Sequence, residues 1–406
     1  MIVRLLNSLS EFGSHSGRSR VLRWALIYCS AVPLPAFAQL PPPGKERLVF
    51  AGGSVQKGRI AVDDAGRPHI VSDQGRSGRR AFYSYFNGAA WLTQELGPSG
   101  QPVQAINEPK IAFTRGFLYI TYWWRAATPK GPGPWKVSLQ QIGDSSKVPR
   151  VTGWLDVADG ASPEINLDDE GRVVLSWRAS GTSFRYQIFD GMRPLGPPKE
   201  LMLIEETFPG EEDVGCSSGN DSDLDSRGVL HIACNNQEYG WFYSNSEFPE
   251  KGQGVQIIAA PHQSGCCHEW TVSSLAADRR EIGVLYFVIG GGDNRAYLVR
   301  RRDSRWSKPQ PLSSLATQQS EKRASPAITA LPEGGAVIAW MENDGRRSIV
   351  HIARMDADAK LGPRKQVAYG MNPRFAVDQQ RMVHVAYTRA GNLFYIRTKL
   401  PGNEIE

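Results

Sequence analysis

Seven copies of one short pattern recur along the chain at nearly even spacing. Each copy is a turn with Gly or a charged residue followed by an alternating apolar segment, and successive copies end 47 to 57 residues apart. The copies are GRPHIVS (66–72), GFLYITY (116–122), GRVVLSW (171–177), GVLHIAC (228–234), IGVLYF (282–287), GGAVIAW (334–340) and RMVHVAY (381–387). A repeat of this length indicates one supersecondary unit that buries its apolar faces against its neighbours.

Each copy lies inside a longer unit of short strands. One alternating segment precedes it, as in RIAVDDAG (59–66), and a third follows it, as in RAFYSYF (80–86). A weaker fourth segment completes most units, as in AWLTQELG (90–97). Four antiparallel strands per unit are typical of a propeller blade, and the 3.6-residue period of helical repeats is absent. We expect an all-β fold, a single seven-bladed β-propeller over residues 47–400, with six or eight blades as alternatives.

The two ends of the repeat region predict how the ring closes. The last unit stops near Leu400 after three strands, and the segment RLVFAGGSV (47–55) before the first unit is a spare strand. Unpaired edge strands invite aggregation. We therefore expect the N-terminal strand to supply the outer strand of the seventh blade, and residues 401–406 to form a C-terminal tail.

The N-terminus has the three parts of a secretory signal. A segment with four arginines precedes the apolar run WALIYCSAVPLPAFA (24–38), which ends in the small-residue pattern of a cleavage site. The run is too short to span a membrane, and an uncleaved anchor is the alternative. We predict a signal peptide over residues 1–38, a Pro-rich linker over 39–46, and export of the mature protein to the periplasm or the medium.

The charge of the chain excludes two classes of partner. Its formal net charge is +6, and removal of residues 1–38 takes away four arginines and one glutamate and leaves a charge near +3. No block of like charge remains, so we expect neither nucleic acid nor an anionic membrane surface as a partner. No other stretch has the length of a membrane span. We expect a monomer without a cofactor.

The chain resembles the sialidase-type propellers, which carry BNR or Asp-box repeats. An Asp box reads Ser-x-Asp-x-Gly-x-x-Trp at the turn between the third and fourth strands of a blade. SYFNGAAW (84–91) keeps Ser84, Gly88 and Trp91 but has Phe86 in the aspartate position. The three arginines, the tyrosine with its glutamate and the acid aspartate of true sialidases cannot be placed by motif. The chain also resembles seven-bladed propellers that bind or cleave uronate-containing polysaccharides. Both resemblances imply a carbohydrate ligand.

A ligand site is expected where the loops that lead into the first strands meet on the axis of the ring. Arginine binds carboxylates through a planar two-donor fork, and tryptophan offers a flat apolar face that suits a sugar ring. We predict that an acidic oligo- or polysaccharide binds in this funnel. The substrate-binding residues that we expect are Arg59, Trp123, Arg125, Arg178, Arg323 and Arg374.

Two reactions fit such a funnel. Glycoside hydrolysis needs two carboxyl groups, one of them acting as an acid, and Glu164, Asp221 and Glu269 are the candidates. A uronate lyase needs a base and a cation, for which His268 with Arg323 or Arg374 is the candidate set. A non-catalytic scaffold, or a propeller that binds a protein partner, is the alternative from another class.

The remaining histidines and the cysteines have a simpler interpretation. His69, His231 and His384 share one position of the repeat, which favours packing or a hydrogen bond between blades over function. Four cysteines follow the predicted signal: Cys216, Cys234, Cys266 and Cys267. An even count in an exported protein favours disulfides, and the pairing stays open. A metal site from these cysteines and His268 lacks the paired spacing of zinc sites, so we predict none.

Overall fold

The computed structural model describes residues 40–75, 80–98, 100–143, 149–180, 183–202, 218–236, 240–247, 256–258, 273–290, 295–312, 325–344 and 346–402. Residues Leu40–Glu406 form one compact unit, apart from Met1–Gln39. The predicted signal peptide lies outside the described residues. Throughout the described ranges the regular elements are strands, and none of them includes a helix long and apolar enough to span a membrane.

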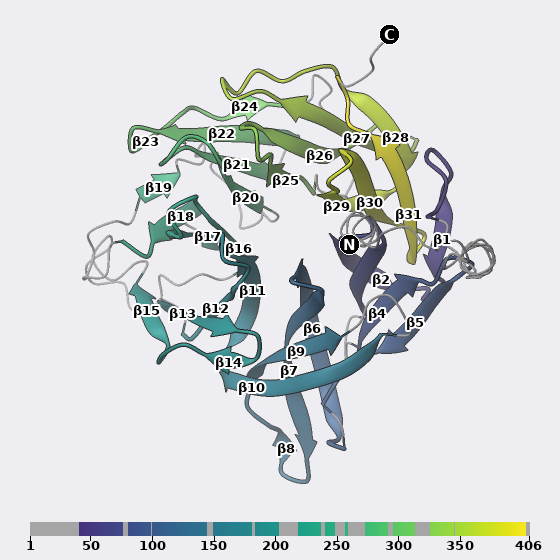
Figure 1. Ribbon diagram of the computed structural model, residues 1–406, viewed down its shortest axis with the longest axis vertical. Helices are drawn as coiled ribbons and strands as arrows, with labels where there is room; N and C mark the ends of the chain where they lie inside the picture. Colours follow the sequence, from purple (N-terminus) through teal and green to yellow (C-terminus); the bar gives the residue numbers. More distant parts are fainter. Residues whose placement is uncertain are drawn as a thin grey trace, which may run out of the picture. The chain divides into compact units, whose positions relative to one another are not determined.

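The strands of Leu40–Glu406 form seven antiparallel sheets around one axis (Figure 1). The first blade is β2 (Val55–Val62), β3 (Pro68–Gln74), β4 (Arg80–Phe86) and β5 (Trp91–Glu95). The second is β6 (Val103–Thr114), β7 (Phe117–Thr128), β9 (Lys136–Gly143) and β10 (Arg150–Asp159), with β8 (Gly131–Pro132) paired to β7. The third is β11 (Ala161–Leu167), β12 (Val173–Arg178) and β13 (Ser183–Asp190), with β14 (Arg193–Pro194) and β15 (Lys199–Met202) both paired to β13.

The other four blades repeat this order. The fourth is β16 (Ser218–Leu224), β17 (Leu230–Asn236), β18 (Gly240–Asn245) and β19 (Gln256–Ile258). The fifth is β20 (Ser273–Ala277), β21 (Leu285–Gly290) and β22 (Ala296–Arg302), with β23 (Arg305–Trp306) and β24 (Gln310–Pro311) paired to β22. The sixth is β25 (Ala327–Ala330), β26 (Ala336–Asn343), β27 (Ser348–Met355) and β28 (Lys365–Tyr369), and the seventh is β29 (Met371–Val377), β30 (Met382–Arg389), β31 (Asn392–Lys399) and β1 (Arg47–Phe50). The predicted all-β, seven-bladed fold is therefore confirmed, and the six- and eight-bladed alternatives are wrong.

The N-terminal strand closes the ring as the sequence predicts. Strand β1 pairs antiparallel with β31, with Arg47 opposite Tyr395. Glu46, next to this strand, accepts hydrogen bonds from the hydroxyl of Tyr387 and from both terminal nitrogens of Arg389. The last blade thus takes its outer strand from the start of the unit, and the edge of β31 is covered.

The core lies between neighbouring blades, and the repeat explains it. One residue near the end of each second strand is buried at the same position: Ser72, Tyr122, Trp177, Cys234, Ile289, Trp340 and Tyr387. Trp177, for example, packs with residues of blades two and three. Burying a large apolar side chain stabilises the fold by roughly 1.5–3 kcal/mol. The large residues Tyr122, Trp177, Ile289, Trp340 and Tyr387 at this position therefore help to hold neighbouring blades together.

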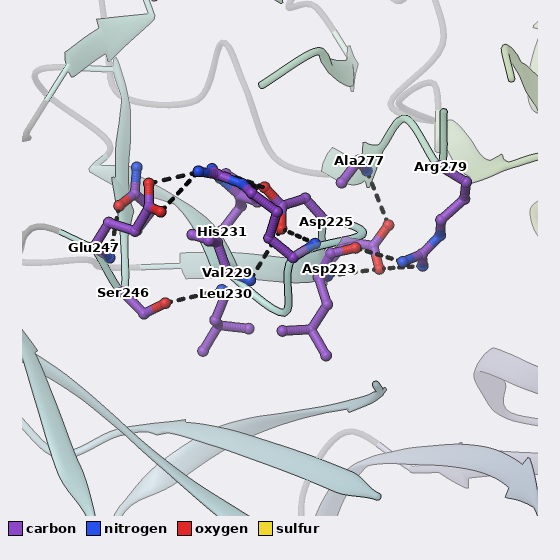
Figure 2. Close-up of polar contacts among 12 residues, drawn as sticks. Asp223, Asp225, Val229, Leu230, His231, Ser246, Glu247, Ala277 and Arg279 are labelled. Atoms are coloured by element: carbon purple, nitrogen blue, oxygen red, sulfur yellow. Dashed lines mark hydrogen bonds and ion pairs between the residues drawn. The ribbon is translucent and has the colours of Figure 1, made fainter. Parts of the chain in front are cut away.

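The three repeated histidines are structural. In blades one, four and seven, an aspartate in the first hairpin caps the turn by accepting backbone N–H groups. The histidine six residues later places Nδ1 2.7 to 2.8 Å from a tyrosine hydroxyl and Nε2 2.9 to 3.5 Å from that aspartate. The sets are Asp63–His69–Tyr83, Asp225–His231–Tyr243 and Asp378–His384–Tyr395. Figure 2 shows Asp225 beside His231. The contacts lie within one blade rather than between blades.

The degenerate Asp-box sequence occupies the turn between the third and fourth strands of blade one. Asn87 replaces the missing aspartate as the capping residue of this turn, because its Oδ1 accepts the N–H groups of Ala89 and Ala90 at 3.0 and 2.9 Å. Trp91 packs its ring edge-on against Tyr395 of the last blade. The turn therefore helps to join blades one and seven.

Candidate functional site

A cavity of about 240 Å³ lies on the axis, and the first strands of all seven blades line it. These are β2, β6, β11, β16, β20, β25 and β29, the innermost strands in Figure 1. Residues that are far apart in sequence meet there because each blade contributes the same strand. The lining mixes charged and polar side chains with apolar ones such as Ile60, Ile111 and Phe375, whereas the layers between blades are apolar.

One equivalent position of the seven first strands forms a ring of side chains around this cavity. In chain order it is occupied by Arg59, Lys110, Glu164, Asp221, Ser274, Ala327 and Arg374. We call these residues the axial ring. The cations stand on the contiguous blades seven, one and two, and the carboxylates stand on blades three and four. The ring therefore has a cationic and an anionic side.

A shared backbone device places three of these charged residues. Lys110, Glu164 and Arg374 each follow a proline, and a non-glycine residue with positive φ precedes the proline: Glu108 (46°), Ser162 (49°) and Asn372 (53°). The strand register shifts at the same three places. Bulges re-aim side chains, and a residue before proline normally stays extended, so these positions hold strain. Such strain is typical of functional sites.

Hydrogen bonds between blades stabilise two of the strained residues. The carbonyl of Ser162 accepts a bond of 2.9 Å from Nδ2 of Asn220 in the next blade. Oδ1 of Asn372 accepts a bond of 2.8 Å from the hydroxyl of Ser325 in the blade before it. These hydrogen bonds hold the two bulges against the neighbouring blades, so the backbone that carries Glu164 and Arg374 is fixed in place.

The carboxylates of the axial ring have partners. Lys110 Nζ donates to Glu164, and the two side chains are only 10% and 8% exposed. Asp221 Oδ2 accepts the backbone N–H of Leu275 at 2.9 Å. Burial raises the pKa of Glu164 to about 7, against the opposing effect of Lys110, and Asp221 raises it further. Burial also lowers the pKa of Lys110. Glu164 therefore exchanges its proton near neutral pH.

The arginines of the axial ring have donors to spare. Arg374 is 4% exposed and donates from Nη1 to the carbonyl of Pro373 at 2.7 Å, but its buried Nε has no hydrogen-bond partner in the described part of the chain. Burial lowers the pKa of Arg374 to about 9, and the nearby charge of Arg59 lowers it as well. No described residue forms a hydrogen bond or ion pair with the side chain of Arg59. The side chain of Arg59 and Nε of Arg374 therefore both lack an acceptor among the described residues.

A second ion pair lines the cavity next to the axial ring. Asp223 lies two residues after Asp221 on β16, so it faces the same side of the strand. Figure 2 shows its carboxylate between the N–H of Ala277 and the guanidinium of Arg279, each 2.9 Å away. Burial raises the pKa of Asp223, while Arg279 opposes this. Blades four and five are joined here.

Three of the predicted binding residues lie elsewhere. Trp123 and Arg125 stand on the far part of β7, opposite Asn107 and Ala105, and do not line the cavity. The rings of Trp123 and Trp135 are 4.2 Å apart, and the guanidinium of Arg125 lies 4.6 Å from the Trp135 ring. Arg178 ends β12, where burial lowers its pKa and Glu108 opposes this.

Several predicted residues lie outside the described residues: His268, Glu269, Arg323, Cys216, Cys266 and Cys267. Cys234, at the buried position near the end of β17, is the described cysteine. The disulfide and the lyase base therefore stay predictions. Across the described residues, no three His, Cys, Asp or Glu side chains gather as metal ligands would.

Sequence reasoning did not single out Lys110, Asp223 or Arg279 as site residues. A strict alignment of the seven first strands finds Lys110, because it shares a position with Arg59 and Glu164. Asp223 and Arg279 come from different blades, and only the packing of blade four against blade five brings them together.

No protein-family model and no curated protein matches the chain. Solved structures match it at low identity. The NanB sialidase of Streptococcus pneumoniae is 12% identical with a TM-score of 0.48, over 92% of this chain and 72% of that one. The intramolecular trans-sialidase of Ruminococcus gnavus is 10% identical with a TM-score of 0.46, over 88% and 97%.

The sialidase of Trypanosoma rangeli is 13% identical with a TM-score of 0.42, over 90% of this chain and 60% of that one. The chain therefore spans about 60% of the length of that enzyme. At these identities the likeness concerns the fold alone.

Proposed function

We propose that this protein binds a carboxylate-bearing carbohydrate in the central cavity. The observation that carries the proposal is the pair of neighbouring arginines on the axis. The side chain of Arg59 has no hydrogen-bond partner among the described residues, and Nε of Arg374 has none either. Like charges held together in a partly dry site are costly unless an anion joins them. A ligand carboxylate satisfies both guanidinium groups through charge-assisted hydrogen bonds.

The opposite side of the axial ring suits sugar hydroxyls. Glu164 and Asp221 present carboxylate oxygens, and Ser274 adds a hydroxyl. A cavity of about 240 Å³ is smaller than the range of about 300–1,000 Å³ for drug-sized ligands. The cavity therefore suits one acidic sugar unit, with any further units extending outside it. Exposed charges on a protein surface bind salt ions only weakly. Such weak binding does not account for charged groups that are buried as deeply as those of the axial ring.

A second candidate activity is cleavage of the bound sugar. A glycosidase needs one carboxyl group that is protonated near the operating pH and a second that is ionised. The pKa of Glu164, about 7, favours the role of the acid, and Asp221 on the next blade is the partner carboxylate. A lyase would instead use His268 as the base with Arg323 or Arg374 as the cation. In both cases the carboxylate of the substrate is held by the arginines.

We also propose that the mature protein is exported after cleavage of residues 1–38 and that its cysteines form disulfides. The three-part signal at the N-terminus supports export. An exported propeller would meet acidic polysaccharides outside the cytoplasm. Neither proposal is needed for binding in the central cavity.

The test is a titration of the mature protein with acidic and neutral sugars matched in ring and linkage. Glucuronate, galacturonate and sialic acid are the acidic set, and glucose and galactose are the neutral controls. We expect saturable calorimetric binding by at least one acid and none by its neutral counterpart. A search for reducing ends and for unsaturated uronate products on acidic polysaccharides then separates hydrolase, lyase and binder. Absence of binding and turnover with every acid would favour the scaffold alternative.

A further inference from the structure

A second cavity lies between blades six and seven. Its volume is about 380 Å³. The turn between β26 and β27, the connection from β28 to β29 and the end of β30 line it. In an antiparallel four-stranded blade, the connection from second to third strand lies on the same face as the connection into the first strand. The cavity, which we call the blade-seven pocket, therefore opens on the face from which the axial strands start.

Three arginines and no acidic residue line this pocket: Arg346, Arg347 and Arg389. No described residue forms an ion pair with Arg346 or Arg347. The guanidinium of Arg347 lies 5.1 Å from the centre of the Tyr369 ring, which orients it. Stacking on an aromatic face leaves the edge of the guanidinium free to donate.

The acidic groups near the pocket are committed to other roles. Asp344 Oδ1 accepts the backbone N–H groups of Arg346 and Arg347 at 2.8 and 2.7 Å and so fixes their turn. Glu46 fixes Arg389 through its ion pair and also accepts the hydroxyl of Tyr387. Asp344 therefore fixes the backbone of Arg346 and Arg347, Glu46 fixes the side chain of Arg389, and neither carboxylate lines the pocket.

The inner wall of the pocket adds a hydroxyl with no partner. Ser348 Oγ is buried and has no hydrogen bond in the described part of the chain, although its residue lines the pocket. Gly370 lies beside it and donates its N–H to the carbonyl of Ser348 at 2.9 Å. A Cβ on Gly370 would come within 2.9 Å of the carbonyl oxygen of Thr388, so the backbones approach closely here.

We propose that the blade-seven pocket is a binding site for an oxyanion group, a carboxylate or a sulfate. The guanidinium groups of Arg346 and Arg347 each offer a fork of N–H donors that matches the planar or tetrahedral array of oxygens on such a group. The hydroxyl of Ser348 supplies a further donor. This site does not depend on the function proposed for the central cavity. Met371 lines the pocket and Arg374 lines the cavity, three residues apart on β29 and roughly 10 Å by strand rise. If the proposed function holds, one acidic chain therefore reaches both sites.

The test follows the arginine Nε–Hε signals by NMR during titration with sodium sulfate and, in a separate arm, sodium glucuronate. Ionic strength is held constant with sodium chloride. The signals of Arg346, Arg347 and Arg389, assigned by single Arg→Lys changes, should shift to saturation with a common dissociation constant. Because the double variant R346A/R347A loses the charge-assisted hydrogen bonds of two arginines, the dissociation constant read from the Arg389 signal should be at least tenfold higher in it.

Matched variants separate this site from the central cavity. Arg193→Ala removes an exposed arginine on blade three, 73% exposed, and should leave the titration unchanged. Arg59→Ala should also leave it unchanged, so failure of the central site does not affect the result. Saturation with sulfate alone would assign a small free oxyanion as the ligand, and saturation with glucuronate would assign a sugar acid. A linear shift shared by all exposed arginines, or an unchanged response of Arg389 in R346A/R347A, would overturn the proposal.

Discussion

Lys110 of blade two and Glu164 of blade three form an ion pair at the axis of the ring, with side chains only 10% and 8% exposed. The pair joins the cationic and anionic sides of the axial ring. Lys110→Met should leave the carboxyl group of Glu164 buried without its cation and lower the free energy of unfolding by about 3–5 kcal/mol. Urea denaturation at neutral pH measures the loss.

The half-exposed pair of Lys136 and Asp156 is the control for this change. Its atoms lie 3.3 Å apart, with side chains 38% and 29% exposed. Lys136→Met should cost no more than about 1 kcal/mol, because exposed pairs contribute little. The double change K110M/E164M should recover most of the loss seen in K110M. Equal effects of the two single changes would contradict a buried pair on the axis.

The pKa of Glu164 predicts a specific dependence of stability on pH. Its folded value of about 7 lies above its ordinary value of 4.5, because of burial. The folded protein therefore holds a proton that the unfolded chain releases, and the contribution to stability is complete below about pH 4.5 and is lost as the pH rises to about 7. Relative to Glu164→Gln, the wild-type protein should lose on the order of 3 kcal/mol across this window. Urea unfolding of both proteins at a series of pH values measures the difference, and a constant difference would show that Glu164 titrates normally.

The histidine sets make a prediction about the blades rather than the site. Tyr83 donates or accepts the bond to His69 Nδ1 at 2.7 Å in a buried position. Tyr83→Phe leaves that nitrogen unsatisfied and should cost about 1–3 kcal/mol in unfolding free energy. Tyr369→Phe, at a site where the side chain is 39% exposed, is the control and should cost little. A Tyr83→Phe protein as stable as the control would mean that the His69 contact contributes nothing.

The sequence predicts the number and order of the blades well, but it does not place every residue within a blade. The repeat of about fifty residues predicts each blade, since an alternating strand must bury one face against its neighbours. The alignment of the fifth copy is wrong at the buried position near the end of the second strand. Ile289, not Phe287, occupies the position that Cys234 and Trp340 hold in their blades. The first hairpin of that blade, Asp278 to Val284, is two residues longer than that of blade four, and pattern matching cannot place such an insertion.

The repeat also predicts some residues of the candidate site correctly and places others wrongly. Arg59, Glu164, Asp221 and Arg374 line the cavity because they lie on first strands, and first strands converge in any closed ring. Trp123 and Arg125 were expected there too, but β6 and β7 run for twelve residues each and carry these side chains beyond the cavity. On this extension Trp123 packs against Trp135, a contact that the repeat pattern does not encode.

The cysteines give a chemical test of export. If the chain is exported, Cys216, Cys234, Cys266 and Cys267 should be oxidised in protein isolated from the producing cell without reductant. Thiol titration of the mature, denatured protein should then find no free thiol, and peptide mass spectrometry should identify the two pairs. Four free thiols would contradict the disulfides and weaken the case for export.

The most direct test of the central claim is the effect of Arg59 on the binding of an acidic sugar. Calorimetric titration with the best acid from the panel should show affinity at least tenfold lower for Arg59→Ala than for the wild-type protein, because the loss of a charge-assisted bond costs about 1.5–3 kcal/mol. Arg193→Ala should bind as the wild-type protein does. Binding that is unchanged in Arg59→Ala, or equally strong for the neutral counterpart of the sugar, would contradict recognition of a carboxylate at the axis.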